Sequence, residues 1–383
     1  MRFRWHIVLA CALFAIPVSA QEPAGTSRPS ITTIPVFAHF VSWHAVPGAW
    51  ATAATMPLRR DNPAGGYASA DPDIIAQQNA EMSANGIVPM VSWWARDTYA
   101  GDAFLRTYLA QPGPPIGILY EAVGPGRMQE GADRGIHLDD PANANIFIDD
   151  MAHLQTEFFD KYPQERFFRI GGRPVVFVWI TANFHGPFDK VVAQARTHAA
   201  FYLIGADFTV PFSIRPGLDE IVRGMDAMSA YGFYDPGRYG LDMPSDFLRD
   251  YAAAVPQWLQ WLSGHAPGVR LLLPMGFAYD ETRIPGRHGW VFRSSIAIAR
   301  QYAEMVRGFI ANPCGSAVLP YAYITSYNEH YEGTAIEPFE ISRGEEGPPS
   351  KYLDIISQTF LHVPPPDDEA RQLCQGKPDD PRR

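Results

Sequence analysis

The chain has 383 residues, of which 46% are hydrophobic, 13% aromatic and 19% charged, and its formal net charge is −10 at pH 7. An acidic chain without clustered Lys and Arg is a poor nucleic-acid binder, because phosphate contacts need such clusters. The length is sufficient for a large hydrophobic core, formed by one α/β domain or by two smaller ones.

The first 20 residues have the pattern of a signal peptide. Arg2 and Arg4 give a basic start, residues 7–18 are apolar, and residues 18–20 suit the cleavage positions. This apolar run is too short to span a bilayer. We therefore expect an exported protein, periplasmic or extracellular, with no membrane anchor. Removing Arg2 and Arg4 takes the formal charge from −10 to −12.

Signal cleavage also removes Cys11, which leaves Cys314 and Cys374. In an oxidising compartment these two cysteines could pair. The leader after the signal peptide is polar and rich in Pro and Ser, and the end of the chain is rich in Pro and charged residues. The expected organisation is a flexible leader, a single domain and a loosely ordered tail, at residues 21–33, 34–362 and 363–383.

Short apolar runs alternate with helical patterns along the chain. Continuously apolar strands are typical of a parallel sheet that is covered on both faces. The predicted strands span residues 34–40, 87–92, 116–120, 173–179, 201–205, 225–230, 270–274 and 317–325. The predicted helices span residues 72–85, 105–109, 141–162, 191–200, 218–223, 247–262, 294–310 and 352–360.

Two of these helices have clear start signals. Asp71 and Asp140 are placed to cap them, and Pro72 and Pro141 fit the first helical position. Eight strand–helix units in one domain predict a single (β/α)8 barrel. The alternative is a doubly wound open sheet, but no GxGxxG follows the first strand to support a nucleotide site.

The carboxyl ends of the predicted strands are rich in acids, histidines and aromatic residues. Active sites of (β/α)8 barrels form at this end. Taken singly, Trp93 could be core packing, His39 a satisfied core histidine and Asp207 a cap, whereas together they favour a polar site. The residues predicted to lie there are His39, Trp43, His44, Trp93, Trp94, Glu121, Asp207, Tyr231, Tyr234, Glu329 and Glu332.

Glu329 and Glu332 directly follow the last predicted strand. A helical turn would put these two residues on one face, since positions i and i+3 are neighbours on a helix. Two carboxylates held close together in a sugar-sized cleft are the minimum equipment for cleaving a glycosidic bond. In the alternative interpretation, Glu329 caps a helix and Glu332 is a solvated surface acid.

With this motif, the chain resembles glycoside hydrolase family 99, the endo-α-mannosidase group. The central segment is SYNEHYEGTAIEP at residues 326–338. Three further segments match in the family's order, GIVPMVSWW at 86–94, FRIGGRPVVFVW at 168–179 and GFAYDETRI at 276–284. The resemblance extends from about residue 35 to residue 340.

The resemblance implies a retaining, endo-acting hydrolase of α-linked mannosides that uses no metal or other cofactor. Glu332 would be the general acid/base, and Glu329 the base that takes a proton from the sugar's 2-hydroxyl to close a 1,2-anhydro sugar. Tyr231 or Tyr234 would contact that hydroxyl, and Trp93 or Trp94 would line a sugar subsite. The full set of predicted substrate-binding residues is Trp93, Trp94, Trp43, His44, Glu121, Tyr231, Tyr234, His330 and Tyr331.

The chain departs from the family pattern near these glutamates. His330 replaces the family's Trp, Tyr331 replaces its His or Gly, and the first strand ends in HFVSWH where relatives have a YYPWY-like run. These positions shape sugar subsites, so the substrate can differ while the catalytic pair is kept.

Two other functions remain open. The first is a non-catalytic glycan-binding or polysaccharide-assembly protein on the same barrel, against which the retained carboxylate pair argues. The second is a metal-dependent hydrolase, although no HxH or HExxH motif joins its candidate ligands, which are His39, His44, Glu121 and Asp207. We expect a monomer whose partner is an oligosaccharide or polysaccharide.

Overall fold

The structure is a computed structural model of the chain. It describes residues 33–44, 53, 55–57, 66–94, 96, 98, 100–123, 127–231, 234, 236–240, 245–282, 284, 286, 289–311, 317–341 and 351–361. The predicted signal peptide, Cys314, Cys374, the tail 363–383 and all but the last residue of the leader lie outside this description.

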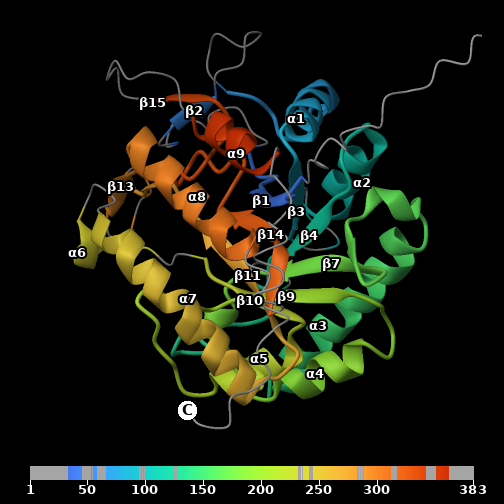
Figure 1. The fold of residues 1–383 in the computed structure, drawn as a ribbon. Coiled ribbons are helices and arrows are strands. Elements are labelled where there is room, and N and C mark those ends of the chain that lie inside the picture. The colour runs from blue at the N-terminus through green and yellow to red at the C-terminus, as the bar shows by residue number, and fades with distance from the viewer. Residues whose placement is uncertain are drawn as a thin grey trace, which may run out of the picture.

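Eight parallel strands close into a barrel at the centre of the molecule (Figure 1). Each strand pairs with the next one along the chain, and the last, β14, returns to pair with the first, β1, so the ring has no free edge. The barrel strands are β1 (Val36–Phe40), β3 (Ile87–Trp93), β4 (Gly117–Tyr120), β7 (Arg173–Val178), β9 (Tyr202–Ala206), β10 (Ala227–Ser229), β11 (Arg270–Met275) and β14 (Val318–Ile324). The predicted single (β/α)8 barrel is confirmed.

Helices surround this barrel (Figure 1). They are α1 (Pro72–Ala84), α2 (Asp102–Ala110), α3 (Pro141–Leu154), α4 (Phe188–Ala195), α5 (Leu218–Gly224), α6 (Pro236–Tyr239), α7 (Ser245–His265), α8 (Ile296–Ala311) and α9 (Tyr352–Phe360), and a π-helical turn, Gln155–Phe159, extends α3. The side chains of Asp71 and Asp140 each accept a backbone hydrogen bond of 2.9 Å at the start of a helix. Both predicted caps are confirmed, as are the prolines at the first helical positions.

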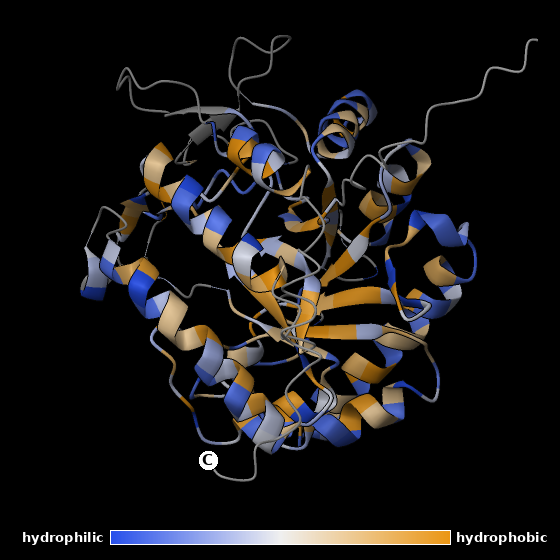
Figure 2. Cartoon of the chain, viewed as in Figure 1, coloured by the Kyte–Doolittle hydropathy of each residue, from blue (hydrophilic) through white to orange (hydrophobic). Residues whose placement is uncertain are grey.

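Two hydrophobic layers hold the barrel and its helices together. Side chains alternate along each strand, so Phe37 points into the barrel while Val36 and Ala38 belong to the layer beneath the helices. The strands are accordingly mostly hydrophobic, whereas the outer faces of the helices are largely hydrophilic (Figure 2). Among the described residues, no helix combines the length and apolar character needed to cross a membrane.

Several short elements are additional to the predicted pattern. One of them, the hairpin formed by β12 and β13, lies beyond the carboxyl end of β11 and contributes to the cavity described below. The additional elements are β2 (Thr55–Pro57), β5 (Ile136–His137), β6 (Arg169–Ile170), β8 (Phe184–His185), β12 (Ala278–Asp280), β13 (Val291–Arg293), β15 (Phe339–Ile341) and the 3-10 turns Gln164–Arg166 and Thr181–Asn183.

Candidate active site

The segment after β14 is fixed to the ends of two neighbouring strands. The hydroxyl of Thr325 donates to the carbonyl of Met275 at the end of β11, at 3.0 Å. The Asn328 side chain pairs with the backbone of Val41 after β1, accepting at 2.8 Å and donating at 3.1 Å. Residues 325–328 are therefore held over the rim of the barrel, and they position the glutamates that follow.

Glu329 closes a tight turn. Its Oε1 accepts the backbone N–H of Tyr331 at 2.8 Å and that of Glu332 at 3.4 Å. Gly333 has a φ of +61°, a conformation that favours glycine, and the chain then folds back so that Ile336 bonds to Ser326. The expected helical turn is thus a non-helical one. The capping interpretation of Glu329 applies to this turn, but the described residues directly after it, up to residue 341, form no helix.

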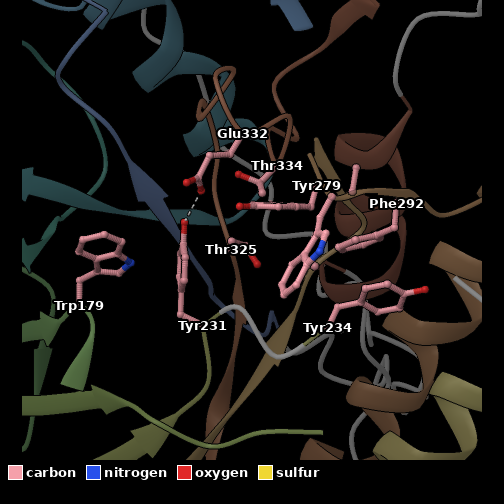
Figure 3. A pocket seen from close by; sticks show the side chains of 11 residues that line it. Trp179, Tyr231, Tyr234, Tyr279, Phe292, Thr325, Glu332 and Thr334 are labelled. Atoms are coloured by element: carbon pink, nitrogen blue, oxygen red, sulfur yellow. Dashed lines mark hydrogen bonds between the residues drawn. The ribbon is translucent and has the colours of Figure 1, made fainter. Parts of the chain in front are cut away.

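Glu332 is directed into a cavity at the carboxyl end of the barrel. The Tyr231 hydroxyl donates to Glu332 Oε2 at 3.1 Å (Figure 3). Burial and the neighbouring carboxylate of Glu332 keep the pKa of Tyr231 well above its usual value, so this phenol stays protonated and acts as the donor. The carbonyl of Glu332 accepts the backbone N–H of Asp280 in the β12–β13 hairpin at 2.6 Å. Strand β10 and the hairpin therefore jointly orient Glu332.

Glu121 and Glu329 complete a group of carboxyls around Glu332. Both are buried, with 3% of their surface exposed. Burial raises the pKa of Glu121 to about 8, with a further contribution from the charge of Glu332, while the Trp94 indole and Arg127 oppose the shift. Burial and then Glu332 likewise raise the pKa of Glu329 well above its usual value, and backbone N–H groups and the Trp43 indole oppose this. The site therefore holds protons at a pH where exposed carboxyls are ionised.

Trp43 and Trp94 lie on the acidic side of the site. Their ring centroids are 5.5 Å apart, and each indole lowers the pKa of one carboxyl, Trp43 that of Glu329 and Trp94 that of Glu121. These two predicted residues thus lie in the site beside Glu329 and Glu121, respectively.

Three other predicted residues pack behind the turn. His44 is buried, its Nε2 donates to the Asn328 carbonyl at 2.9 Å, and its ring stacks on Tyr331 with centroids 5.0 Å apart. His330 is also buried and its Nε2 lies 3.0 Å from Glu337 Oε2. The Tyr67 hydroxyl and the Gln78 amide donate to the same carboxyl at 2.9 and 3.2 Å. We call Tyr67, Gln78, His330 and Glu337 the Glu337 network.

Trp93 does not face the cavity. Its side chain is completely buried in the layer beneath the helices, its Nε1–H donates to Asp102 at 2.9 Å, and the Arg127 guanidinium lies 4.9 Å from its ring. It shares strand parity with Val91, which also points outward. This position corrects the substrate-binding prediction for Trp93 and supports the packing interpretation.

His39 and Asp207 also have structural partners. Burial lowers the pKa of His39 to about 3, so its ring is neutral; it hydrogen-bonds Tyr323 at 3.0 Å and stacks on Tyr231 with centroids 5.4 Å apart. Asp207 forms an ion pair with Arg215, in which two guanidinium nitrogens donate to its carboxylate. Within the described part of the chain, no three His, Cys, Asp or Glu side chains form a group that could hold a metal ion.

The cavity beside Glu332 has a volume of about 220 Å³. Tyr231 and Tyr234, both predicted substrate-binding residues, line it, with Trp179 and Tyr231 on one side and Tyr234, Tyr279 and Phe292 on the other (Figure 3). The sequence prediction missed Trp179, Gly276, Ala278, Tyr279, Trp290, Phe292, Thr325 and Thr334, which also line it. Trp179 was detectable, since it is an aromatic residue at the end of the predicted strand 173–179.

Fold and geometry define a (β/α)8 barrel with a buried carboxyl cluster and an aromatic cavity at the carboxyl ends of its strands. Among solved structures, two of the GH99 endo-α-mannosidase from Bacteroides thetaiotaomicron are similar to it. The structure in complex with bis-tris propane is 18% identical with a TM-score of 0.59, and the other is 19% identical with a TM-score of 0.60; each alignment covers 89% of this chain and 98% of the other.

A third similar structure is described as a glycoside hydrolase-like protein. It is 15% identical with a TM-score of 0.64, and the alignment covers 88% of this chain and 98% of the other. No protein-family model matches the chain, and no curated protein sequence does. The resemblance to family 99 seen in the sequence therefore extends to the fold.

Proposed function

We propose that this protein is a retaining glycoside hydrolase that cleaves α-linked mannosides within a chain. The principal support is the pair formed by buried Glu329 and partly buried Glu332, held together by one turn at the barrel rim. Two close carboxyls in a low-dielectric site do not both ionise readily, so one is held as an acid while the other acts as a base. The family resemblance and the similar enzyme structures support the choice of an α-mannoside.

In the proposed first step, Glu329 takes the proton of the 2-hydroxyl and that oxygen attacks C1. The C1–O glycosidic bond breaks as Glu332 gives its proton to the leaving oxygen, which produces a 1,2-anhydro sugar. A raised pKa suits Glu329 for this step, because a carboxylate that binds protons tightly is a stronger base once ionised.

In the proposed second step, Glu332 takes a proton from water and the resulting hydroxide attacks C1. The C1–O2 bond breaks and Glu329 returns its proton to O2. Each step inverts the configuration at C1, so the product keeps the original one. Tyr231 donates to Glu332 throughout and keeps its carboxyl oriented between the two steps.

The test is hydrolysis of a panel of α-mannan oligosaccharides by wild type, Glu332→Gln and a control, Glu304→Gln, whose residue is exposed on α8. A second substrate, α-mannobiosyl fluoride, needs no proton on its leaving group. We expect kcat/KM of Glu332→Gln to fall about 10³-fold on the oligosaccharides and far less on the fluoride, because kcat/KM reports the first step, in which the fluoride needs no general acid. Equal activity of Glu332→Gln and wild type on both substrates would refute the proposal. A wild type that binds the panel without cleaving it would favour a glycan-binding role instead.

We also propose that the chain is exported as a monomer after removal of residues 1–20, on the strength of the basic start and apolar run in the sequence. Amino-terminal sequencing of the protein recovered outside the cytoplasm would place the new amino terminus at Gln21, and its elution as a single chain would give the oligomeric state.

A further inference from the structure

The aromatic cavity lies on one side of the catalytic pair. Glu332 lines it, whereas Glu329 and Glu121 are not among the described residues that do. Glu329 instead faces its own turn and the Trp43 indole. The cavity is therefore reached from Glu332 without passing Glu329.

This asymmetry identifies which sugar the cavity can hold, and the inference rests on the proposed function. The sugar whose C1 reacts must touch both glutamates, because its 2-hydroxyl meets Glu329 and its glycosidic oxygen meets Glu332. The next sugar is attached through that oxygen, so it touches Glu332 alone. We propose that the aromatic cavity is the leaving-group subsite, and that it accepts an uncharged sugar whose apolar face stacks on Trp290.

Trp290 has the placement of a stacking platform. Its side chain is 43% exposed, which is unusual here, since few large hydrophobic residues in the described part of the chain are exposed. It lies in the turn of the β12–β13 hairpin, where Tyr279 and Phe292 of the two strands line the same cavity. The C–H face of a pyranose is apolar and matches such a surface, while its hydroxyls remain directed to polar groups.

The platform is held in place by a buried carboxyl. Glu281 is 2% exposed, and it accepts the Tyr279 hydroxyl at 2.7 Å and the backbone N–H of Trp290 at 3.2 Å. The backbone N–H of Glu281 donates in return to the Trp290 carbonyl at 3.0 Å. Because two of these bonds use the backbone of residue 290, substituting its side chain leaves them intact.

Charge and size set the class of sugar. None of the described residues that line the cavity is Lys, Arg or His, and Glu332 is the carboxylic acid among them. The nearby Arg293 is paired with Asp280 at 3.3 Å. A uronate would therefore meet a carboxyl, with no compensating cation among the lining residues that the structure describes. The volume of about 220 Å³ is below the roughly 300–1,000 Å³ of pockets for drug-sized ligands, which suits one sugar ring.

The test compares two leaving groups in Trp290→Ala and Trp290→Phe. A neutral α-mannan oligosaccharide leaves as a sugar, whereas α-mannobiosyl fluoride leaves nothing in the cavity. We expect the ratio of kcat/KM for the oligosaccharide to kcat/KM for the fluoride to fall about tenfold in Trp290→Ala, a loss typical of one exposed apolar contact, and to recover in Trp290→Phe. Ile214→Ala, at an exposed residue that does not line the cavity, should leave the ratio unchanged.

An unchanged ratio in Trp290→Ala, or equal losses on both substrates, would overturn the subsite and leave the proposed function standing, provided that Glu332→Gln still loses oligosaccharide cleavage. Preferential cleavage by wild type of uronate-containing oligosaccharides over neutral ones would overturn the uncharged-sugar assignment. A wild type that cleaves neither α-mannobiosyl fluoride nor any of the oligosaccharides would refute the proposed function and this inference together.

Discussion

Two buried glutamates, Glu329 and Glu337, lie eight residues apart in the sequence and have opposite surroundings. Glu337 receives three side-chain donors, from Tyr67, Gln78 and His330. Glu329 receives backbone N–H groups and faces a second carboxyl, Glu332, which raises its pKa. Burial is common to both, so the partners decide which carboxyl is structural and which one has its pKa raised further by a neighbouring carboxylate.

The largest expected effect is on catalysis. Glu329→Gln keeps an oxygen that can accept the N–H groups of Tyr331 and Glu332, but it cannot take a proton. We expect kcat on α-mannan oligosaccharides to fall about 10³-fold, within the range for loss of a general base. The free energy of unfolding should stay within about 1 kcal/mol of wild type or rise, because the variant no longer buries an ionisable group. A large fall in the free energy of unfolding together with a nearly unchanged kcat would show that Glu329, like Glu337, has a structural role.

The Glu337 network should respond in the opposite way. Glu337→Ala removes the acceptor from Tyr67, Gln78 and His330, and each buried polar group left without it costs about 1–3 kcal/mol. We expect urea denaturation to show a loss of about 3–5 kcal/mol. Glu337→Gln retains one acceptor and should lose less. The proposed structural role fails if folded Glu337→Gln has a normal denaturation midpoint but a kcat as low as that of Glu329→Gln.

The next effect concerns the third buried glutamate of this region, Glu121, and a pH titration of stability should detect it. The pKa of Glu121 is raised from 4.5 to about 8, so the folded state binds more protons than the unfolded state in that range. Stability is then fully present below pH 4.5 and is lost as the pH rises toward 8, by up to about 3 kcal/mol between pH 5 and pH 8. Glu121→Gln should remove this loss. Parallel stability curves for wild type and Glu121→Gln would show that Glu121 ionises normally in the folded protein.

The fold could be predicted from the sequence because each barrel strand is a mostly apolar run between recognisable helix signals. The candidate catalytic segment could be predicted because the paired glutamates directly follow such a run. Which side chains face the site depended on strand parity: Trp94 follows the inward residues Val88 and Met90, whereas Trp93 follows Val91 outward. The same rule predicts Trp179 and Tyr231 as inward.

The side of the cavity formed by the β12–β13 hairpin could not be predicted from the sequence in this way. Residues 278–293 contain charged residues, Pro and Gly where a barrel strand would be apolar, and β12 and β13 are held by long-range partners. Glu332 accepts from the hairpin backbone at Asp280, and Glu281 bonds across the hairpin to Trp290. Local sequence preference does not encode such pairings, so Trp290 was absent from the predicted site.

The smallest expected effect is a shift of the pH–rate profile, which should distinguish Trp43 from Trp94. The Trp43 indole favours the ionised form of Glu329, and the Trp94 indole favours that of Glu121. Trp43→Phe should therefore raise the pKa of Glu329 and move the acid limb of the pH–rate profile upward by roughly half a pH unit, the equivalent of one weak hydrogen bond. Trp94→Phe acts on a carboxyl that takes no proton in the proposed reaction, so it should move the pH dependence of stability and leave that limb in place. Equal shifts of the acid limb in the two variants would show that Glu121 and Glu329 titrate as one unit. The base in the reaction would then be the group of carboxyls and not Glu329 alone.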